Sequence, residues 1–460
     1  MLYTYICPQE LPQFSSKQLL SSEHHDEYPL SSYITPPPPP IISYPALFRI
    51  GALDLERNRT VRTVFIMIAA DNSYLDNAAL PSGESPELVL VQATPEERIA
   101  AIKLNSPAWK GPLDLDAYIA RENHLAQQAL TKDGLTSWLL VVRGQPEGER
   151  TILSSCETYK KKAILAQNGR VEHVSALSIG SVFCRPEFRG KGYAKRMMQE
   201  LVKKIDMWQT EPKATNRMPF SLLYSDIGKK FYAQFGWMPY PSTHFSLPPL
   251  PKDEYDRAIV RGNLPKARTL VAEDVHRFMC NIDVVQKELD ILRVASQKSA
   301  SAKVAVVPDF DHFKWHWARE EYYAKILFKD RAPPLIKGAG DEQSKVYCSW
   351  NRNFGETPEE NTLYILRWVY DEPTSSEETE KTAKAMAAII RRAQLEAHAW
   401  NMSKVQFWNP TPVLERAVAI LDPTAQVVHR EQDSVACLRW SGAEQGKNVE
   451  WLWNEKYAWC

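Results

Sequence analysis

Hydrophobic and polar positions over residues 86–247 follow two periods that alternate in a regular order. Apolar residues that alternate with polar ones predict half-buried strands, and apolar residues spaced three or four apart predict helices. The resulting element order, β-α-α-β-β-β-α-β-α-β, is typical of a mixed α/β domain. Its main elements are strands over 88–93, 137–143, 152–165, 173–184 and 220–224 and helices over 95–109, 115–130, 190–207 and 229–235.

Single residues mark some of the element ends. Thr94 followed by Pro95 and two glutamates predicts a helix N-terminus, because Thr is a good N-cap and proline and acidic residues suit the first turn. Gly236 is expected to end the helix over 229–235 as a C-cap. The three lysines at 160–162 interrupt a long apolar strand, and we interpret them as a solvated strand end.

The remaining chain divides by composition. Residues 269–460 repeat the strand and helix succession of the first domain's second half, which predicts a second domain of related architecture without the first domain's glycine loop. Its clearest elements are strands over 345–350, 363–370, 405–408 and 435–440 and helices over 381–400 and 413–421. A proline-rich linker is expected over 248–268. Residues 1–85 are expected to be disordered, with the five prolines at 36–40 either a stiff spacer or a ligand for an SH3-type domain.

Composition indicates a soluble, intracellular protein. The 460 residues are 44% hydrophobic and 24% charged, with a formal net charge of zero, so no overall field draws the chain to nucleic acid or to an anionic membrane. The seven cysteines are scattered and form no CxxC pair, which argues against a disulfide framework or a zinc site. No apolar run reaches the length of about 18 residues that a membrane span needs. We therefore expect a cytoplasmic protein.

The sequence SVFCRPEFRGKGYAKRMM at 181–198 places a glycine-containing loop between a strand and a helix. It lacks the GK[ST] of a nucleotide-binding P-loop, and Lys195 stands where a dinucleotide fingerprint needs a third glycine. The backbone N–H groups of 189–194 nevertheless lack partners within the helix, and the helix dipole adds positive charge there. Such a loop is suited to bind a pyrophosphate, and the alternative is a turn that only starts a helix.

The flanking residues resemble a known family. The spacing V-x-C-x-P-x-x-R-G-x-G-x-A at 182–194 is similar to the acetyl-CoA signature of the GCN5-related N-acetyltransferase (GNAT) superfamily, and FYAQFGW at 231–237 resembles its second signature. The longer stretches SVFCRPEFRGKGYAKRMM and LLYSDIGKKFYAQFGWMPYPSTH resemble the fungal L-lysine N6-acetyltransferases of lysine catabolism. The resemblance covers roughly residues 86–460. It implies a GNAT acyl-CoA N-acyltransferase fold, a mixed twisted sheet flanked by helices, with a second GNAT-like C-terminal domain.

The resemblance also implies acetyl-CoA as co-substrate, held by two groups of residues. The backbone of the strand end would bind the pantetheine arm, and the loop would bind the diphosphate. These residues are Val182, Phe183 and Cys184 in the strand and Arg189, Gly190, Lys191, Gly192, Tyr193 and Ala194 in the loop.

Candidate catalytic residues follow from the same resemblance. Tyr232 matches the tyrosine of the second signature and is the candidate acid toward the CoA sulfur. The base has several candidates: Glu172 or His173 at the start of a long strand, Glu157 on the neighbouring strand, and the terminal carboxylate of Cys460, which some tandem GNAT-fold acyltransferases place in the active site.

The acceptor is expected to be a small-molecule amine, most simply free L-lysine. Arg121 and Glu122 could contact its carboxylate and ammonium groups, and a solvated helix face is the alternative. Another small amine, a protein lysine, and a non-catalytic CoA-binding protein stay open. His312 and His316 beside Asp309 and Asp311 have a spacing that could chelate a metal, but no further His or Cys is near in sequence, and we expect no metal.

Overall fold

The computed structural model describes residues 80–210, 218–299, 301–441 and 449–459. The predicted leader therefore lies largely outside the described residues. The elements of the first half are β1 (Leu88–Gln92), α1 (Pro95–Trp109), α2 (Leu115–Ala126), β2 (Leu135–Val142), β3 (Ser154–Gln167), β4 (Arg170–Cys184), α3 (Tyr193–Thr210), β5 (Phe220–Ser225), α4 (Lys230–Ala233), β6 (Met238–Pro239) and β7 (Thr243–Leu247).

The second half contains more helix. Its elements are α5 (Lys252–Arg261), β8 (Arg268–Leu270), α6 (Ala272–Met279), α7 (Ile282–Gln297), β9 (Ala302–Val306), α8 (Phe310–Leu327), β10 (Gly338–Asp341), β11 (Val346–Asn353), β12 (Thr362–Val369), α9 (Ser376–Ala399), β13 (Lys404–Trp408), α10 (Pro412–Leu421), β14 (Val428–His429), β15 (Val435–Trp440) and β16 (Val449–Trp451). The predicted mixed α/β class is confirmed. None of the described helices is long and apolar enough to cross a membrane.

The predicted start of α1 is confirmed in detail. The Thr94 hydroxyl accepts a hydrogen bond from the Glu97 N–H at 3.2 Å, and the Glu97 carboxylate accepts one from the Thr94 N–H at 2.9 Å. This reciprocal pair is a capping box, and it satisfies two donors that would otherwise lack partners.

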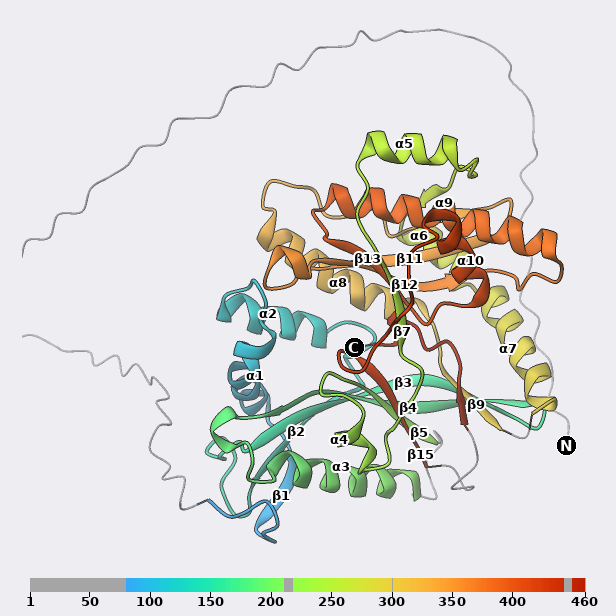
Figure 1. Ribbon diagram of the computed structural model, residues 1–460. Helices are drawn as coiled ribbons and strands as arrows, with labels where there is room; N and C mark the ends of the chain where they lie inside the picture. The colour runs from blue at the N-terminus through green and yellow to red at the C-terminus, as the bar shows by residue number, and fades with distance from the viewer. Residues whose placement is uncertain (1–79, 211–217, 300, 442–448, 460) are drawn as a thin grey trace, which may run out of the picture. The chain divides into compact units, whose positions relative to one another are not determined.

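The first sheet has the strand order β1-β2-β3-β4-β5-β15-β6, with β9 and β16 added along β3. Helix α3 lies along one face of this sheet, as Figure 1 shows, and its apolar side joins residues of β1 to β5 in one hydrophobic cluster. Most neighbouring strands are antiparallel, but β4 and β5 are parallel because α3 connects them as a crossover.

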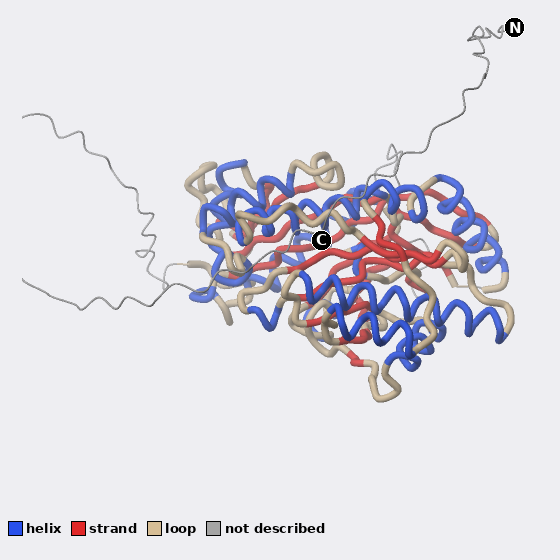
Figure 2. The backbone as a smooth tube through the Cα atoms, turned by 90° about the horizontal axis from the view of Figure 1, so that it is seen from above, coloured by secondary structure: helices blue, strands red, loops and turns tan. Residues whose placement is uncertain are grey.

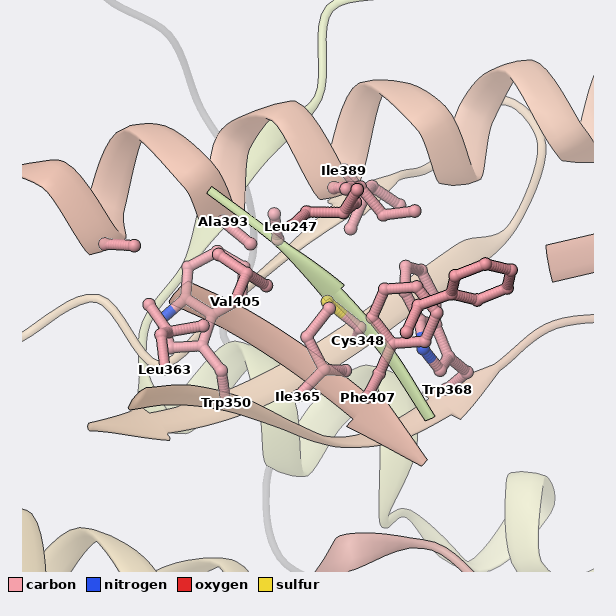
Figure 3. Packing of buried hydrophobic residues seen from close by; sticks show 14 of the residues in the cluster. Leu247, Cys348, Trp350, Leu363, Ile365, Trp368, Ile389, Ala393, Val405 and Phe407 are labelled. Carbon is pink, nitrogen blue, oxygen red and sulfur yellow. The ribbon is translucent and has the colours of Figure 1, made fainter. Parts of the chain in front are cut away.

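The second sheet has the order β14-β7-β13-β12-β11-β10-β8 and carries α9 on its outer face. Figure 3 shows Leu363 and Ile365 of β12 and Val405 and Phe407 of β13 pointing toward Ile389 and its neighbours on this helix. Alternate residues of these strands face α9, so the residues between them face the first sheet. Strands β12 and β13 are parallel and joined by α9, which repeats the β4–α3–β5 unit.

Each sheet contains strands from both halves of the chain. Strand β15 was correctly predicted at 435–440, but it pairs with β5 in the first sheet, and β7 of the first half pairs with β13 in the second. The predicted linker over 248–268 needs correction, because residues 252–261 form helix α5, whose Tyr255 is buried. In Figure 2 the strands (red) of both sheets cross the interior and helices (blue) lie along them.

The C-terminal tail packs between the sheets. Tyr457 and Ala458 are fully buried. Lys161 of β3 donates a hydrogen bond to the Ala458 carbonyl and is only 1% exposed. The interpretation of the lysines at 160–162 as a strand end is therefore wrong, because they lie in the middle of β3. Lys160 and Lys162 are solvated as expected, but the tail covers Lys161.

Candidate active site

The gap between β4 and β5 is the first feature of the site. Their parallel pairing runs from Ala176–Phe220 to Ile179–Leu223 and stops there. Beyond it β4 continues to Cys184 beside β3 alone, while β5 pairs with β15 on its other edge. The last five residues of β4, which include Val182, Phe183 and Cys184, therefore present a strand edge that β5 does not cover.

A β-bulge lies beside this gap. The register of β3 and β4 shifts between Ser155 and Glu157, and Ser181 has a φ of 53°. Bulges bend a strand and change the direction of its side chains. Here the bend occurs next to the point where β4 leaves β5, and it places Ser181 beside Glu157.

The glycine loop follows directly. After a 3₁₀ turn at Pro186–Phe188, helix α3 begins at Tyr193, and its first helical hydrogen bond runs from the Arg196 N–H to the Gly192 carbonyl. Among the described residues, the N–H groups of Gly190, Gly192 and Tyr193 have no acceptor. Gly190 and Gly192 have φ values of 80° and 86°, which favour glycine. The loop thus offers backbone donors at a helix N-terminus.

Residues before β1 hold this loop. The Gly83 N–H donates to the Lys191 carbonyl at 3.0 Å, and the Tyr193 hydroxyl donates to the Pro81 carbonyl at 2.8 Å. Residues 80–85 are ordered parts of the site, so the expectation of disorder over 1–85 is wrong for them. The signal was absent from the sequence because both acceptors are backbone carbonyls, which any residue supplies.

The other loop residues have local partners. Arg189 is exposed and donates from Nε to the Cys184 carbonyl at 3.3 Å. The Ala194 N–H points to the Cys184 sulfur, and burial raises the pKa of that thiol, so Cys184 stays neutral at physiological pH. Lys195 pairs with Glu84 at the surface.

Glu157 is the acidic residue nearest the gap. It is 6% exposed and pairs with Gly180 in the strand register. Its carboxylate lies 3.1 Å from Arg98 Nε and accepts hydrogen bonds from the Tyr159 hydroxyl at 2.6 Å and the Ser181 hydroxyl at 2.9 Å. A narrow pocket of about 10 Å³, roughly the room of one water molecule, opens on this carboxylate between α1 and strands β2, β3 and β4.

The other predicted bases lie elsewhere. Glu172 and His173 are exposed at the opposite end of β4, with Glu172 paired with Leu165. Eight residues of strand separate Glu172 from Gly180, roughly 26 Å at about 3.3 Å per residue. A carboxylate there cannot reach a proton at the gap, so Glu157 replaces Glu172 as the candidate base. Cys460 lies outside the described residues.

Tyr232 approaches the gap from the other face of the sheet. It lies on the short helix α4, is buried, and shares a hydrophobic cluster with Cys156, Ile179 and Leu223. Because side chains alternate along a strand, Glu157 points to the face opposite that of Cys156 and Tyr232. Burial raises the pKa of Tyr232, so its hydroxyl keeps its proton well above neutral pH.

The predicted acceptor residues are partly buried. Arg121 is 3% exposed, so its interpretation as part of a solvated helix face is wrong. It pairs with Glu122 and donates to the hydroxyl of Tyr323 on α8. The neighbouring Tyr118 donates to Asn105, which lines the same pocket as Glu157. Through Tyr323, the C-terminal half therefore packs against α2 beside this pocket.

The paired histidines of α8 have ordinary packing partners. His312 Nδ1 lies 2.9 Å from the Asp309 carboxylate, and His316 Nε2 lies 3.2 Å from the Tyr457 carbonyl. Burial lowers the pKa of both imidazoles. No group of three possible metal ligands occurs in the part of the chain that the structure describes.

Comparison with known proteins gives related sequences. Residues 244–460 match a family described as the LYC1 GNAT-like C-terminal domain. A protein of Yarrowia lipolytica named lysine acetyltransferase is 27% identical over 296 residues, which cover 56% of this chain and 70% of that protein. An uncharacterized protein of Saccharomyces cerevisiae is 24% identical over 387 residues, 77% of this chain and 93% of its own length.

Solved structures align less closely. A GCN5-related N-acetyltransferase from Kribbella flavida covers 77% of this chain and 71% of its own, with 17% identity and a TM-score of 0.44. Saccharomyces cerevisiae N-myristoyltransferase with bound myristoyl-CoA covers 78% of this chain and 83% of its own, with 11% identity and a TM-score of 0.43. These TM-scores lie below 0.5, so the sequence matches are the stronger similarity.

Proposed function

We propose that this chain, a relative of the GNAT N-acetyltransferases, transfers the acetyl group of acetyl-CoA to the ε-amine of free L-lysine. The observation that supports the transfer most strongly is the glycine loop beside the uncovered edge of β4, where the N–H groups of Gly190, Gly192 and Tyr193 have no acceptor among the described residues. A buried carboxylate, Glu157, stands next to that edge.

The residues present fit a CoA thioester. The N–H groups of Gly190, Gly192 and Tyr193 would bind the diphosphate, since anions are stabilised at a helix N-terminus. The uncovered backbone of Val182, Phe183 and Cys184 is placed to bind the pantetheine arm as an added strand would bind. This arrangement directs the thioester to the gap between β4 and β5, where Glu157 and Tyr232 meet it from opposite faces.

Proton transfer decides what the residues must do. The ε-amine of lysine has a pKa near 10.4, so freeing its lone pair at pH 7 costs about 4.6 kcal/mol. A thiol with a pKa near 8.5 is a better leaving group, so the base matters more than the acid. Glu157 accepts the ammonium proton, directly or through one water, as the nitrogen attacks the thioester carbon. The C–S bond then breaks, the nitrogen gives up its second proton, and the CoA sulfur takes a proton, so the net reaction releases one proton, which leaves through Glu157.

Tyr232 is assigned to that last proton. Tyr232→Phe removes the hydroxyl and keeps the ring, so we expect kcat to fall about 10- to 100-fold because one proton donor is lost. The affinity for CoA should stay within about twofold of the original. Steady-state kinetics with CoA titration measures both, and an unchanged kcat removes Tyr232 from the mechanism.

Free lysine as the acceptor has two supports. One sequence relative carries the name lysine acetyltransferase. The carboxylate of Glu157 is buried behind α1 and the strands and lines a pocket with room for about one water molecule. A buried amine site of this kind favours a small molecule over a lysine within a folded protein.

One assay tests the function as a whole. The purified chain is incubated with acetyl-CoA and L-lysine, L-ornithine, spermidine or a lysine-containing peptide, and products are identified by mass together with thiol release. We expect N6-acetyl-L-lysine as the main product. Acetylation of the peptide or the polyamine alone would replace lysine as acceptor, and CoA binding without thiol release would show a binding protein.

A further inference from the structure

One buried arginine differs from the others. Among the described residues, four arginines are buried, and three of them have a carboxylate partner: Arg121 with Glu122, Arg352 with Glu320, and Arg367 with Glu288. The fourth, Arg430, is 6% exposed and forms no ion pair with any described residue. Burying an unpaired charge is costly, so such a residue needs an explanation.

The guanidinium of Arg430 is fixed on two sides. Its Nη1 donates to the Thr243 carbonyl at 3.4 Å, and its Cζ lies 4.0 Å from the centre of the Trp408 ring. Its Nε and Nη2 are buried and have no partner among the described residues. These two N–H groups lie on one edge of the guanidinium, where they form the fork that binds a carboxylate with two parallel hydrogen bonds.

Nearby acidic residues do not occupy this fork. Glu431, next in sequence, pairs with Lys229, and Asp433 is exposed and forms no ion pair with Arg430. Burial lowers the pKa of Arg430 to about 10, and the guanidinium still carries its charge at neutral pH. The fork is therefore a charged, oriented donor pair that the described chain leaves open.

Arg430 lies on the side of the first sheet that carries Glu157. The Trp408 ring beneath it is 5.6 Å from the ring of Tyr224, which follows Leu223, the last residue of β5 paired with β4. Since the Leu223 side chain faces α3, Tyr224 faces the opposite side, as Glu157 does. The fork and the candidate base thus lie on the same side of the first sheet, in the layer between the sheets.

Other polar atoms in the layer between the sheets also lack partners. The Ser178 hydroxyl on β4 and the Asn351 side-chain oxygen on β11 are buried with no hydrogen bond among the described residues. Ser178 pairs with Tyr159 in the strand register, and Asn351 pairs with Tyr364. Burial raises the pKa of the Tyr364 hydroxyl, and the charge of Arg430 partly opposes this increase. A polar ligand or ordered water between the sheets would satisfy these atoms.

We propose that Nε and Nη2 of Arg430 bind the α-carboxylate of the acceptor amino acid. This assignment rests on the proposed acetyl transfer, and it makes the substrate class a free amino acid with a side-chain amine. Extended lysine spans roughly 7 Å between its carboxylate carbon and its ε-nitrogen. Strands β5 and β3 lie about 10 Å apart across β4, so a lysine bound near β5 by its carboxylate directs its amine toward Glu157.

The test compares L-lysine with 1,5-diaminopentane, which is lysine without the carboxylate. For Arg430→Gln we expect kcat/KM with L-lysine to fall about 10- to 100-fold, mostly through KM, because a bidentate charged pair is lost. The value for 1,5-diaminopentane should change less than about threefold. Arg430→Lys should restore part of the activity with lysine, since it returns the charge without the fork. Arg416→Gln, at the surface beside Glu380, is the matched control and should behave as the unchanged chain.

A stability measurement separates binding from structure. Removing a buried charge that has no carboxylate partner should leave the melting temperature unchanged or higher, whereas substitution of a structural arginine would lower the melting temperature. L-Lysine added with CoA should raise the melting temperature of the original chain and not that of Arg430→Gln.

Three results would overturn the proposal. The first is an equal loss of kcat/KM with lysine and with 1,5-diaminopentane in Arg430→Gln. The second is an original chain whose kcat/KM is the same for both amines. The third is an Arg430→Gln chain that no longer folds. If the original chain acetylates no amine, the proposed function itself fails, and the stability shift with lysine still tests the site.

Discussion

Glu157→Gln is expected to lower kcat with L-lysine by about 10²- to 10⁴-fold, the usual contribution of a general base. Glutamine has nearly the same shape and can still accept hydrogen bonds from Tyr159 and Ser181, but it cannot take a proton. The measurement is steady-state turnover at saturating acetyl-CoA. The loss should shrink as pH rises toward 10, because the lysine amine then loses its proton without help.

The matched control for this variant is Glu172→Gln. Glu172 is exposed at the far end of β4, so its substitution should leave kcat within about twofold. Glu157→Gln also leaves Arg98 without its partner, so a melting curve must show that the variant is folded. A folded Glu157→Gln chain with undiminished kcat would exclude Glu157 as the base.

These two glutamates show what the sequence could and could not predict in the site. Glu157 lies on a predicted strand and Glu172 directly before the next one, and nothing in their neighbours distinguishes them. The choice depends on the register of β3 and β4, which pairs Glu157 with Gly180 beside the gap and Glu172 with Leu165 far from it. Register is set by contacts between distant segments, so a local pattern identified the strands but not the base.

The glycine loop was predictable because its geometry depends on neighbouring residues and not on distant segments. The strand end, the two glycines and the start of α3 are consecutive in sequence, and their geometry follows from local rules on helix termini and positive φ. Local rules did not provide the support of the loop by Pro81 and Gly83. They also did not provide the open fork of Arg430, which lies in the loop between β14 and β15.

The predicted division into two domains is limited in the same way, because it depends on strand pairing between distant segments. Strand β15 has a clear apolar pattern at 435–440, and its existence was predicted from it. Its partner is β5, more than 200 residues earlier in the chain. The sequence pattern therefore did not predict which sheet β15 belongs to. The exchange of β7 and β15 between the sheets explains why residues of the C-terminal half reach the candidate site.

Gly190→Val is expected to raise the dissociation constant for CoA about 10- to 100-fold. Gly190 has a φ of 80°, and a β-branched residue adopts this conformation at a cost of about 1–2 kcal/mol, close to a tenfold change in affinity. A Cβ at this position meets no atom within 4 Å, so the side chain would project into the open space from which a diphosphate must approach the amides. Calorimetric titration with CoA measures the change.

Two comparisons separate the effect of backbone strain from the effect of filling the space in front of the amides. Gly144→Val is the matched control, because Gly144 has a φ of 86° and equally open surroundings in the exposed turn after β2, so it should leave CoA affinity unchanged. Gly190→Asn tolerates the left-handed conformation better than Val, yet it fills the same space. If the amides bind the diphosphate, Asn should also weaken CoA binding by about tenfold or more. Unaltered affinity in both Gly190 variants would mean that the loop only starts α3 and that CoA, if bound, is held elsewhere.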